Sequence, residues 1–202
     1  NKLWNACCFR QMQGGEVQGE MDAKLLSSDD RWILLRLDLA IREVSDALAS
    51  YNFATAVQTL YRFFWSEYCD WYVEASKAVL GNAERGTQNA AQEARRANTL
   101  AVIDFILSHT LRLFHPFLPF ITEELWNGMG YAEDMPEDQG GKTIMFAPWP
   151  KALSDDEKAH YGLDDATLAF VDAKYDLVSQ GRNLRRAGNV PGNKKIRYVL
   201  KP

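Results

Sequence analysis

The sequence predicts an all-α protein: an antiparallel helical bundle with a short extended segment and a C-terminal helix–strand appendage. Three observations predict this class. Apolar residues recur at intervals of three and four over several long stretches, N-cap residues precede these stretches, and glycine or proline ends them. Of the 202 residues, 47% are hydrophobic and 12% are aromatic. This composition is enough for one buried core and is too apolar for a disordered chain.

The first two predicted helices follow from their start and stop signals. Residues 1–13 form the last part of a helix that Gly14 and Gly15 end. The polar residues 27–30 then supply N-cap chemistry for a long amphipathic helix. Its predicted inward face contains Ile33, Leu37, Ile41, Val44, Leu48 and Tyr51.

The next predicted helix is the most aromatic part of the chain. Asn52 can cap its start, and Gly81 ends it. Its apolar face is wide enough to indicate burial against more than one neighbour. The predicted inward residues are Phe53, Val57, Leu60, Phe64, Tyr68, Trp71, Ala75 and Val79.

Prolines separate the two helices that follow. Residues 88–114 form a third long helix, which opens polar and alanine-rich and ends before Pro116. Pro119 is tolerated in the first turn of a short helix that runs through Trp126 and is closed by Gly128.

The C-terminal part combines a loop, a helix and two extended segments. Residues 131–141 are acidic and turn-rich, and residues 142–146 are predicted to be extended. A last helix spans residues 164–186, and Pro191–Gly192 turn the chain into a strand at residues 196–200. The inward residues of this last helix are predicted to be Leu168, Val171, Tyr175 and Val178.

These elements divide into two parts. Consecutive long helices joined by short turns pack as antiparallel neighbours, so we expect residues 1–150 to form the bundle. Residues 151–202 are expected to be the start of a truncated C-terminal appendage. Asn1 stands where an initiator Met would be, and Pro202 directly follows the predicted strand. We therefore expect the sequence to be a piece of a longer protein.

The charge is strongly polarised along the chain. The formal net charge is −4, which on average argues against a nucleic-acid binder. From Arg182 onward, however, there are seven basic residues and no acidic one, so the first 181 residues carry −11. Two interpretations stay open: the basic end neutralises phosphates, or it is a solvated helix end that meets the rest of a longer protein. The seven residues are Arg182, Arg185, Arg186, Lys194, Lys195, Arg197 and Lys201.

Several classes of protein are excluded by what the sequence lacks. No apolar run approaches the roughly 18 residues that a membrane span needs, and no signal sequence opens the chain. Of the three cysteines, Cys7 and Cys8 are adjacent and poorly placed to bridge each other. We therefore expect no disulfide framework. We expect instead that the protein is located in a reducing compartment, the cytoplasm.

Two motifs could carry chemistry but are incomplete. Residues 140–143 resemble the end of a phosphate-binding loop, yet Pro136 stands where that motif needs glycine, and no strand precedes it. Glu157 and His160 have the spacing of di-iron helical bundles, but the second copy that such sites need is missing. A plain turn and a surface charge pair explain these residues better, so we expect no metal and no cofactor in this chain.

Five stretches resemble, in order and spacing, the anticodon-binding region of the valyl-tRNA synthetase family. The resemblance runs across nearly the whole chain and is most specific in its fourth stretch, His-Pro-Phe-Leu-Pro-Phe-Ile-Thr-Glu-Glu-Leu-Trp. Isoleucyl- and leucyl-tRNA synthetases share the fold and remain the alternatives. The stretches are Asn1–Ala6, Asp30–Leu34, Phe63–Tyr72, His115–Trp126 and Ile144–Pro150.

The resemblance implies a monomeric domain that grips the anticodon stem and loop of tRNA(Val) within an enzyme that ligates valine to that tRNA. It implies that ATP and Mg act in a catalytic domain elsewhere in the parent chain. The family's His-x-Gly-His and Lys-Met-Ser-Lys-Ser signatures are absent from this sequence. The 202 residues alone are therefore predicted to be non-catalytic. A helical scaffold that docks a protein partner is the alternative from another functional class.

The resemblance also suggests which residues contact RNA. Arg10, with Lys2 and Asn5 on the opening helix, is expected to face the anticodon, whose unpaired bases can be stacked and hydrogen-bonded. The alternative for Lys2 and Asn5 is that they only cap or solvate that helix. The basic end is expected to touch phosphates along the tRNA without reading its sequence. The residues expected to do so are Arg182, Arg185, Arg186, Lys194 and Lys195.

Overall fold

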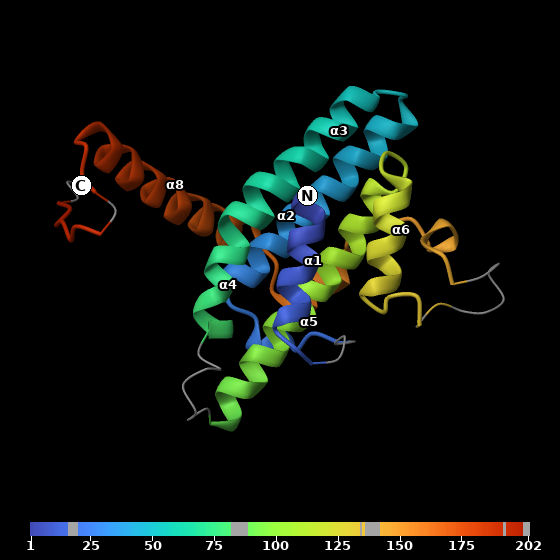
Figure 1. Cartoon of the computed structure of the whole chain (residues 1–202), viewed down its shortest axis with the longest axis horizontal. Coiled ribbons are helices and arrows are strands. Elements are labelled where there is room, and N and C mark those ends of the chain that lie inside the picture. Colours follow the sequence, from blue (N-terminus) through green and yellow to red (C-terminus); the bar gives the residue numbers. More distant parts are fainter. Residues whose placement is uncertain (16–19, 82–88, 134, 136–141, 192, 200–202) are drawn as a thin grey trace.

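The computed structural model describes residues 1–15, 20–81, 89–133, 135, 142–191 and 193–199. These residues form an all-α bundle, and no strand occurs among them (Figure 1). Three predicted features lie wholly or partly outside them: the acidic loop 131–141, the turn at 140–143 and the turn at Pro191–Gly192. Within the described part of the chain, no helix is long and apolar enough to cross a membrane.

The bundle is built from α-helices and a π-helix. In chain order they are α1 (Lys2–Met12), α2 (Ser28–Ala49), α3 (Phe53–Tyr61), the π-helix η2 (Arg62–Tyr72), α4 (Val73–Leu80), α5 (Ala90–Phe114) and α6 (Pro119–Gly128). The segments α3, η2 and α4 follow one another without a break and form one rod beside α2 (Figure 1).

The N-cap residues that the sequence indicated are the ones that start the helices. Ser27 and Asp30 form a capping box on α2, with the Asp30 amide donating to Ser27 Oγ at 3.1 Å. Asn52 accepts from the Thr55 amide at 3.2 Å and caps α3. Each side chain satisfies a backbone N–H that has no partner inside the helix. These contacts confirm the predicted starts of both helices.

The inward face predicted for α3 is wrong at its beginning. Phe53 and Val57 are exposed and Ala56 is buried instead, whereas Leu60 is buried as predicted. The reason is the π-helix that follows, because its i→i+5 bonding widens the turn and shifts which residues face the core. The prediction assumed one α-helical period from Phe53 to Phe64. Because the period changes in η2, that assumption places Phe53 and Val57 on the wrong face.

The core lies where α2, η2 and α5 meet. Large side chains from all three elements are fully buried there, and the rings of Phe64 and Tyr68 stack at 5.7 Å between centroids. The fully buried residues include Ile33, Leu34, Leu37, Phe63, Phe64, Tyr68, Ile103, Ile106 and Leu107.

The segment predicted to be extended at residues 142–146 contains a short 3-10 helix, η5 (Ile144–Phe146). Thr143 Oγ1 accepts from the Met145 amide at 3.1 Å and caps it. Glu123 of α6 also accepts from Thr143 Oγ1 at 2.8 Å and from the Ile144 amide at 3.1 Å. The backbone of this segment is thus bonded to a side chain of α6 and not to a neighbouring strand. It forms a helical turn in place of the predicted extended segment.

A short helix, α7 (Asp155–Tyr161), was not predicted. Ser154 and Glu157 form its capping box, with the Ser154 amide donating to Glu157 at 2.7 Å. Gly162 ends it in the left-handed conformation with φ 62°. The surface charge pair expected between Glu157 and His160 is thus replaced by a helix cap, and His160 lies against the ring of Tyr161.

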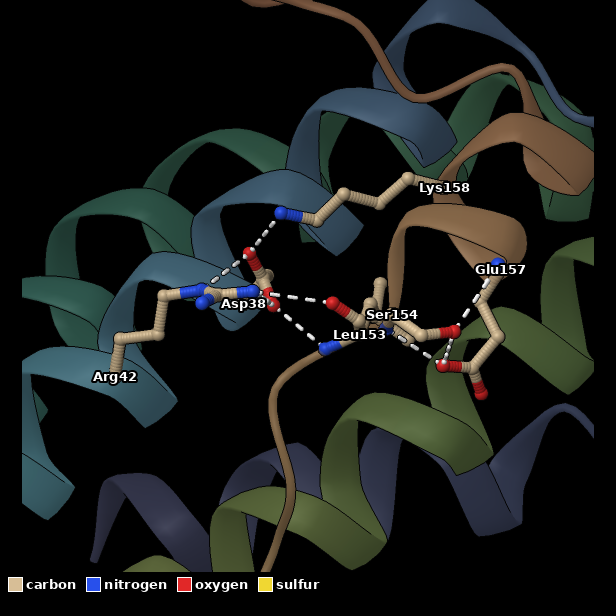
Figure 2. Close-up of polar contacts among 6 residues, drawn as sticks. All are labelled: Asp38, Arg42, Leu153, Ser154, Glu157 and Lys158. Atoms are coloured by element: carbon tan, nitrogen blue, oxygen red, sulfur yellow. Dashed lines mark hydrogen bonds and ion pairs between the residues drawn. The ribbon is translucent and has the colours of Figure 1, made fainter.

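Asp38 fastens this connecting region to α2. Its side chain, only 2% exposed, accepts from the Leu153 amide at 2.7 Å and pairs with Lys158 Nζ at 2.7 Å and Arg42 Nε at 3.1 Å (Figure 2). Burial raises the pKa of this carboxyl, but the hydrogen bonds from Lys158, Arg42 and Leu153 outweigh burial, and the net pKa is lowered.

The last helix, α8 (Asp165–Ala187), buries side chains only in its first half. Val171 and Tyr175 are buried, and the Tyr175 ring stacks on Trp71 at 4.6 Å. Tyr175 is the last buried residue of the helix, and the C-terminal end of α8 projects away from the bundle (Figure 1). Val178 is consequently exposed, which corrects the prediction that it faces inward.

The strand predicted at residues 196–200 does not form within the described residues 193–199. This segment folds back on α8, where the Tyr198 hydroxyl donates to the Gly181 carbonyl at 2.9 Å. A strand needs a neighbouring strand for its backbone hydrogen bonds, and the described residues provide none. Leu200 lies outside the described residues.

Candidate nucleic-acid interface

Arg10, predicted to face RNA, is buried in the core. It follows Leu3, Ala6 and Cys7 on the inward face of α1 and is 3% exposed. Its guanidinium holds Asp104 of α5 with two bonds, Nε to Oδ1 at 2.9 Å and Nη2 to Oδ2 at 2.7 Å. Its remaining nitrogen Nη1 donates to the Gly14 carbonyl at 3.0 Å. The structure thus corrects the expectation for Arg10, because a base cannot reach this side chain.

Lys2 and Asn5 lie on the first turns of α1 and are exposed. Lys2 Nζ forms a surface ion pair with Asp70 Oδ1 of η2 at 3.2 Å. An α-helix rises about 1.5 Å per residue, so Lys2 and Asn5 lie roughly 8–12 Å along the axis from Arg10, which is buried. The three residues predicted on this helix therefore do not form one site.

A cleft opens where α1 and α4 end and α5 begins. It has a volume of about 510 Å³, and in Figure 1 these helix ends lie at the same end of the bundle. We call it the α1–α4–α5 cleft. It contains two cationic side chains and no carboxylate among its described lining residues. These are Phe9, Met12, Gln13, Lys77, Leu80, Gly81 and Arg96.

The two cations of this cleft are held differently. Lys77 pairs with Glu74 one turn earlier, at 2.5 Å, and both side chains are about half exposed. Such a pair contributes little to stability and can be exchanged for another anion. Arg96 Nη2 donates to the Gln13 carbonyl, while Arg96 Nε is buried without a hydrogen-bond partner in the described structure. Lys77 can therefore change its partner, whereas Arg96 is held in place by the Gln13 carbonyl.

The apolar lining of the cleft comes mainly from α1. Met12 is 83% exposed and can adapt to a flat ligand, because its side chain is unbranched and flexible. Phe9 is half-buried and packs against the core. Apolar surface beside cations is the combination that accepts an unpaired nucleotide, whose base packs on side chains while its phosphate pairs with cations.

Sequence reasoning missed Gln13, Lys77 and Arg96. Each has a local signal, because Gln13 precedes a Gly-Gly stop, Lys77 lies in the last turn before Gly81, and Arg96 lies in a polar helix start. A helix end alone does not identify a site, however. Only the tertiary arrangement brings three separate helix ends around one cleft.

The basic end of the chain forms a second candidate surface, on the projecting half of α8. Arg186, Lys194 and Lys195 are exposed there. Arg185 Nη2 donates to the carbonyls of Pro191 at 2.5 Å and Lys194 at 3.0 Å, which folds the tail against the last helical turn. The structure thus brings four of the five predicted residues together near the tip of the helix.

Arg182, the fifth, serves a different contact. Its guanidinium carbon lies 4.7 Å from the ring centroid of Trp71, which in turn stacks on Tyr175. A cation over an indole face is attracted by the ring's negative face. Arg182 is therefore placed as part of the attachment of α8 to the bundle.

Another groove, between α2 and the α3–η2 rod, has a volume of about 560 Å³ but mixed charge. Arg62 pairs with Glu43 at 2.6 Å, and Arg36 pairs with Asp172 at 2.6 Å. Burial raises the pKa of Glu67, which lines the same groove. Because Glu43, Asp46 and Glu67 line this groove, it suits a phosphate less well than the α1–α4–α5 cleft, whose described lining has no carboxylate.

The histidines of α5 have structural partners. Burial, together with the nearby Arg112, lowers the pKa of His109 to about 3, and its Nδ1 lies 2.7 Å from the Phe105 carbonyl. His115 Nδ1 lies 2.8 Å from Thr122 Oγ1 and links the end of α5 to α6. Among the described residues, no group of three or more His, Cys, Asp or Glu side chains could hold a metal ion.

Comparison with known proteins gives a family match over most of the chain. A family model described as the anticodon-binding domain of tRNA ligase matches residues 30–200. This range includes Lys77 and Arg96 of the cleft and the basic residues of α8.

Similar full-length proteins include three bacterial valine–tRNA ligases. The protein from Thermotoga maritima is 35% identical over 201 residues, that from Carboxydothermus hydrogenoformans 37% over 202, and that from Staphylococcus saprophyticus 38% over 210. These alignments cover 99–100% of this chain and 20–21% of the relatives. The chain thus spans about a fifth of the length of the relatives it matches.

Proposed function

The chain belongs to the anticodon-binding domain family of tRNA ligases, and from this premise we propose that it binds the anticodon stem and loop of tRNA(Val) as one domain of a valine–tRNA ligase. The relatives named above are valine–tRNA ligases, and their similarity extends along the whole chain. This favours the valine enzyme over the isoleucine and leucine enzymes that share the fold. The observation that carries the proposal is a cation-lined cleft without described carboxylates in an otherwise acidic bundle.

In this proposal the α1–α4–α5 cleft receives an unpaired nucleotide of the anticodon loop. Lys77 exchanges Glu74 for a phosphate oxygen, and Arg96, anchored on the Gln13 carbonyl, adds the second positive charge of the cleft. The base lies against Met12 and Phe9. Anticodon bases suit such a cleft because they are single-stranded and can be splayed out of the loop.

The tip of α8 adds a second contact in this proposal. Arg186, Lys194 and Lys195 pair with backbone phosphates elsewhere on the same tRNA. Contacts of this kind position the RNA and make binding salt-dependent, but they carry no sequence information. Discrimination between tRNAs therefore comes from the cleft.

The chemical steps belong elsewhere in the proposed enzyme. Valine activation with ATP and Mg would take place in the four fifths of a full-length ligase that this chain does not match. This chain would then act by holding one end of the tRNA. We propose that it does so as a monomer in the cytoplasm, in keeping with three free cysteines.

The test is tRNA binding by the 202-residue chain, measured by gel shift and fluorescence anisotropy at several salt concentrations. Lys77→Ala should weaken all tRNAs and lower the salt slope by about one. Met12→Ala should reduce the preference for the valine anticodon over altered anticodons. Lys151→Ala, which removes an exposed lysine outside both surfaces, is the matched control and should change neither quantity.

Binding that is indifferent to salt and to both substitutions would contradict the proposal. Absence of any tRNA complex, together with capture of a defined protein partner, would favour a helical docking scaffold instead.

A further inference from the structure

One end of the bundle carries an unusually apolar exposed surface. Along α3, Phe53, Val57 and Tyr61 are spaced by four residues and share one face, and each is about half exposed. The turn between α5 and α6 exposes Leu118, and the start of α6 exposes Phe120 to 90%. Scattered apolar side chains are normal on a protein surface, but a contiguous group marks an interaction site.

Aromatic contacts connect these two groups. Tyr61 stacks on Trp65 at 4.6 Å, and Trp65 in turn meets Phe114 at 6.4 Å between ring centroids. Phe114 is the last residue of α5, directly ahead of the exposed turn. Packed aromatic rings therefore join the α3 stripe to the base of the α5–α6 turn, and the exposed side chains of both lie above this packing.

The first turn of α1 extends this surface. Trp4 is 47% exposed and borders a small cavity that Glu124 and Leu125 of α6 also line, one turn after Phe120. In Figure 1 the N-terminus lies between α3 and α6. We call the whole group the apolar end surface. Its members are Trp4, Phe53, Val57, Tyr61, Leu118 and Phe120.

Nucleic acid does not fit this surface. The nearby cations are already paired with carboxylates, Lys2 with Asp70 at 3.2 Å and Arg62 with Glu43 at 2.6 Å. Each of these two cations is matched by a carboxylate, whereas the cleft adds Arg96 to its Lys77–Glu74 pair and so has the greater positive charge for a phosphate. The surface is also separate from the α1–α4–α5 cleft, whose residues come from the other ends of α1 and η2–α4.

We infer that the apolar end surface is where this domain docks on the part of the ligase polypeptide that precedes it. This inference rests on the proposed function, because it takes the chain as one domain of a longer ligase. About four fifths of each relative's length lies outside the match, which is ample for a covering domain. Any polypeptide joined ahead of Asn1 also emerges at the edge of this surface, beside Lys2 and Trp4.

This arrangement gives the two ends of the bundle different partners. The apolar end surface is covered by the same polypeptide, while the cleft at the other end stays open to RNA. Burial of aromatic side chains against a covalently linked neighbour would restrict the bundle's orientation, since linked domains move relative to each other unless their interface is large and hydrophobic.

Hydroxyl-radical footprinting tests the inference on the 202-residue chain and on the complete ligase polypeptide that carries it. Trp4, Tyr61 and Phe120 should be labelled severalfold less in the complete polypeptide. Met12, measured without tRNA, is the internal control and should be labelled equally in both. Equal labelling of all four residues would overturn the inference. Loss of labelling in the short chain as its concentration rises would also overturn it, because a second copy would then be the occupant.

A paired substitution separates this inference from the proposed function. Phe120→Glu in the complete ligase should lower the rate of aminoacylation, whereas the same change in the 202-residue chain should leave tRNA affinity unchanged. Phe170→Glu, at an exposed position on α8, is the matched control and should change neither. Loss of tRNA affinity in the short chain with Phe120→Glu would place RNA on this surface and overturn the inference. Failure of the wild-type chain to bind tRNA would instead contradict the proposed function.

Discussion

Arg10 of α1 and Asp104 of α5 form a buried ion pair with two parallel hydrogen bonds of 2.9 and 2.7 Å, although 94 residues separate them in the sequence. Their side chains are 3% and 2% exposed. The Tyr131 hydroxyl adds a third contact, donating to Asp104 Oδ1 at 3.2 Å. This network ties three separate parts of the chain together in the core.

Breaking this pair from one side should be costly. Arg10→Met or Asp104→Asn alone should lower the free energy of unfolding by about 3–5 kcal/mol, because each leaves the other group buried without its partner. The double variant Arg10→Met with Asp104→Leu should recover most of that loss. Urea denaturation followed by circular dichroism measures this. Lys2→Met, which removes an exposed pair, is the control and should cost less than about 1 kcal/mol. Losses that simply add in the double variant would contradict the pairing.

Asp38 should contribute to stability in a pH-dependent way. Its pKa is lowered in the folded protein, so its contribution is fully present above the unfolded pKa of about 4 and is lost as pH falls through the folded pKa. Asp38→Asn should therefore flatten the acid side of the stability curve between about pH 5 and pH 2. Urea unfolding at a series of pH values checks this, with the exposed Glu124→Gln as the control. If the Asp38→Asn variant loses stability at low pH as the wild type does, other carboxylates cause that loss.

Two of the cysteines should react slowly with alkylating reagents. Burial raises the pKa of Cys7 to about 12 and that of Cys69 to about 11. Only the thiolate reacts, so iodoacetamide near neutral pH should modify both slowly in the folded chain and readily in urea. Mass spectrometry of each peptide measures the rates. Rapid modification of Cys7 in the native chain would mean that α1 detaches from the core.

Substitutions of two arginines on α8 should have different effects, because Arg182 attaches the helix to the bundle and Arg186 is proposed to contact RNA. Arg186→Ala should lower the salt slope of tRNA binding by about one, because an exposed phosphate contact is lost. Arg182→Ala should instead lower stability by about 0.5–1 kcal/mol through loss of the contact with Trp71. Salt titrations and thermal unfolding of both variants test this assignment. A full change of slope with Arg182→Ala would show that it contacts phosphate as well.

The helices were predictable because their signals are local. Ser27, Asn52 and Pro119 begin α2, α3 and α6 as expected, since an N-cap or an N-terminal proline needs only its own turn of helix. The fold class follows from such signals together with the apolar period. The strand at 196–200 failed for the opposite reason, because a strand depends on a partner that local sequence does not specify.

The site was less predictable because burial of a charge depends on its partner. Arg10 continues the spacing of Leu3 and Cys7 along α1, and Asp104 follows Ile103 on α5. Both charges therefore occupy inward positions of their helices, a pattern that indicates a buried pair. Taken alone, Arg10 still reads as a candidate ligand. The cleft residues Lys77 and Arg96 needed the tertiary structure, since nothing in the sequence shows that their helix ends meet.

The projecting half of α8 has a mechanical consequence. About 18 Å of helix lies beyond Tyr175 at a rise of about 1.5 Å per residue. The distance from the bundle to the tip is therefore set by residue count, independently of side-chain chemistry. Inserting or deleting one residue would rotate the tip by about 100° and turn its charges away from their target. Changes of length in this arm should be tolerated only near whole helical turns, as steps of three or four residues.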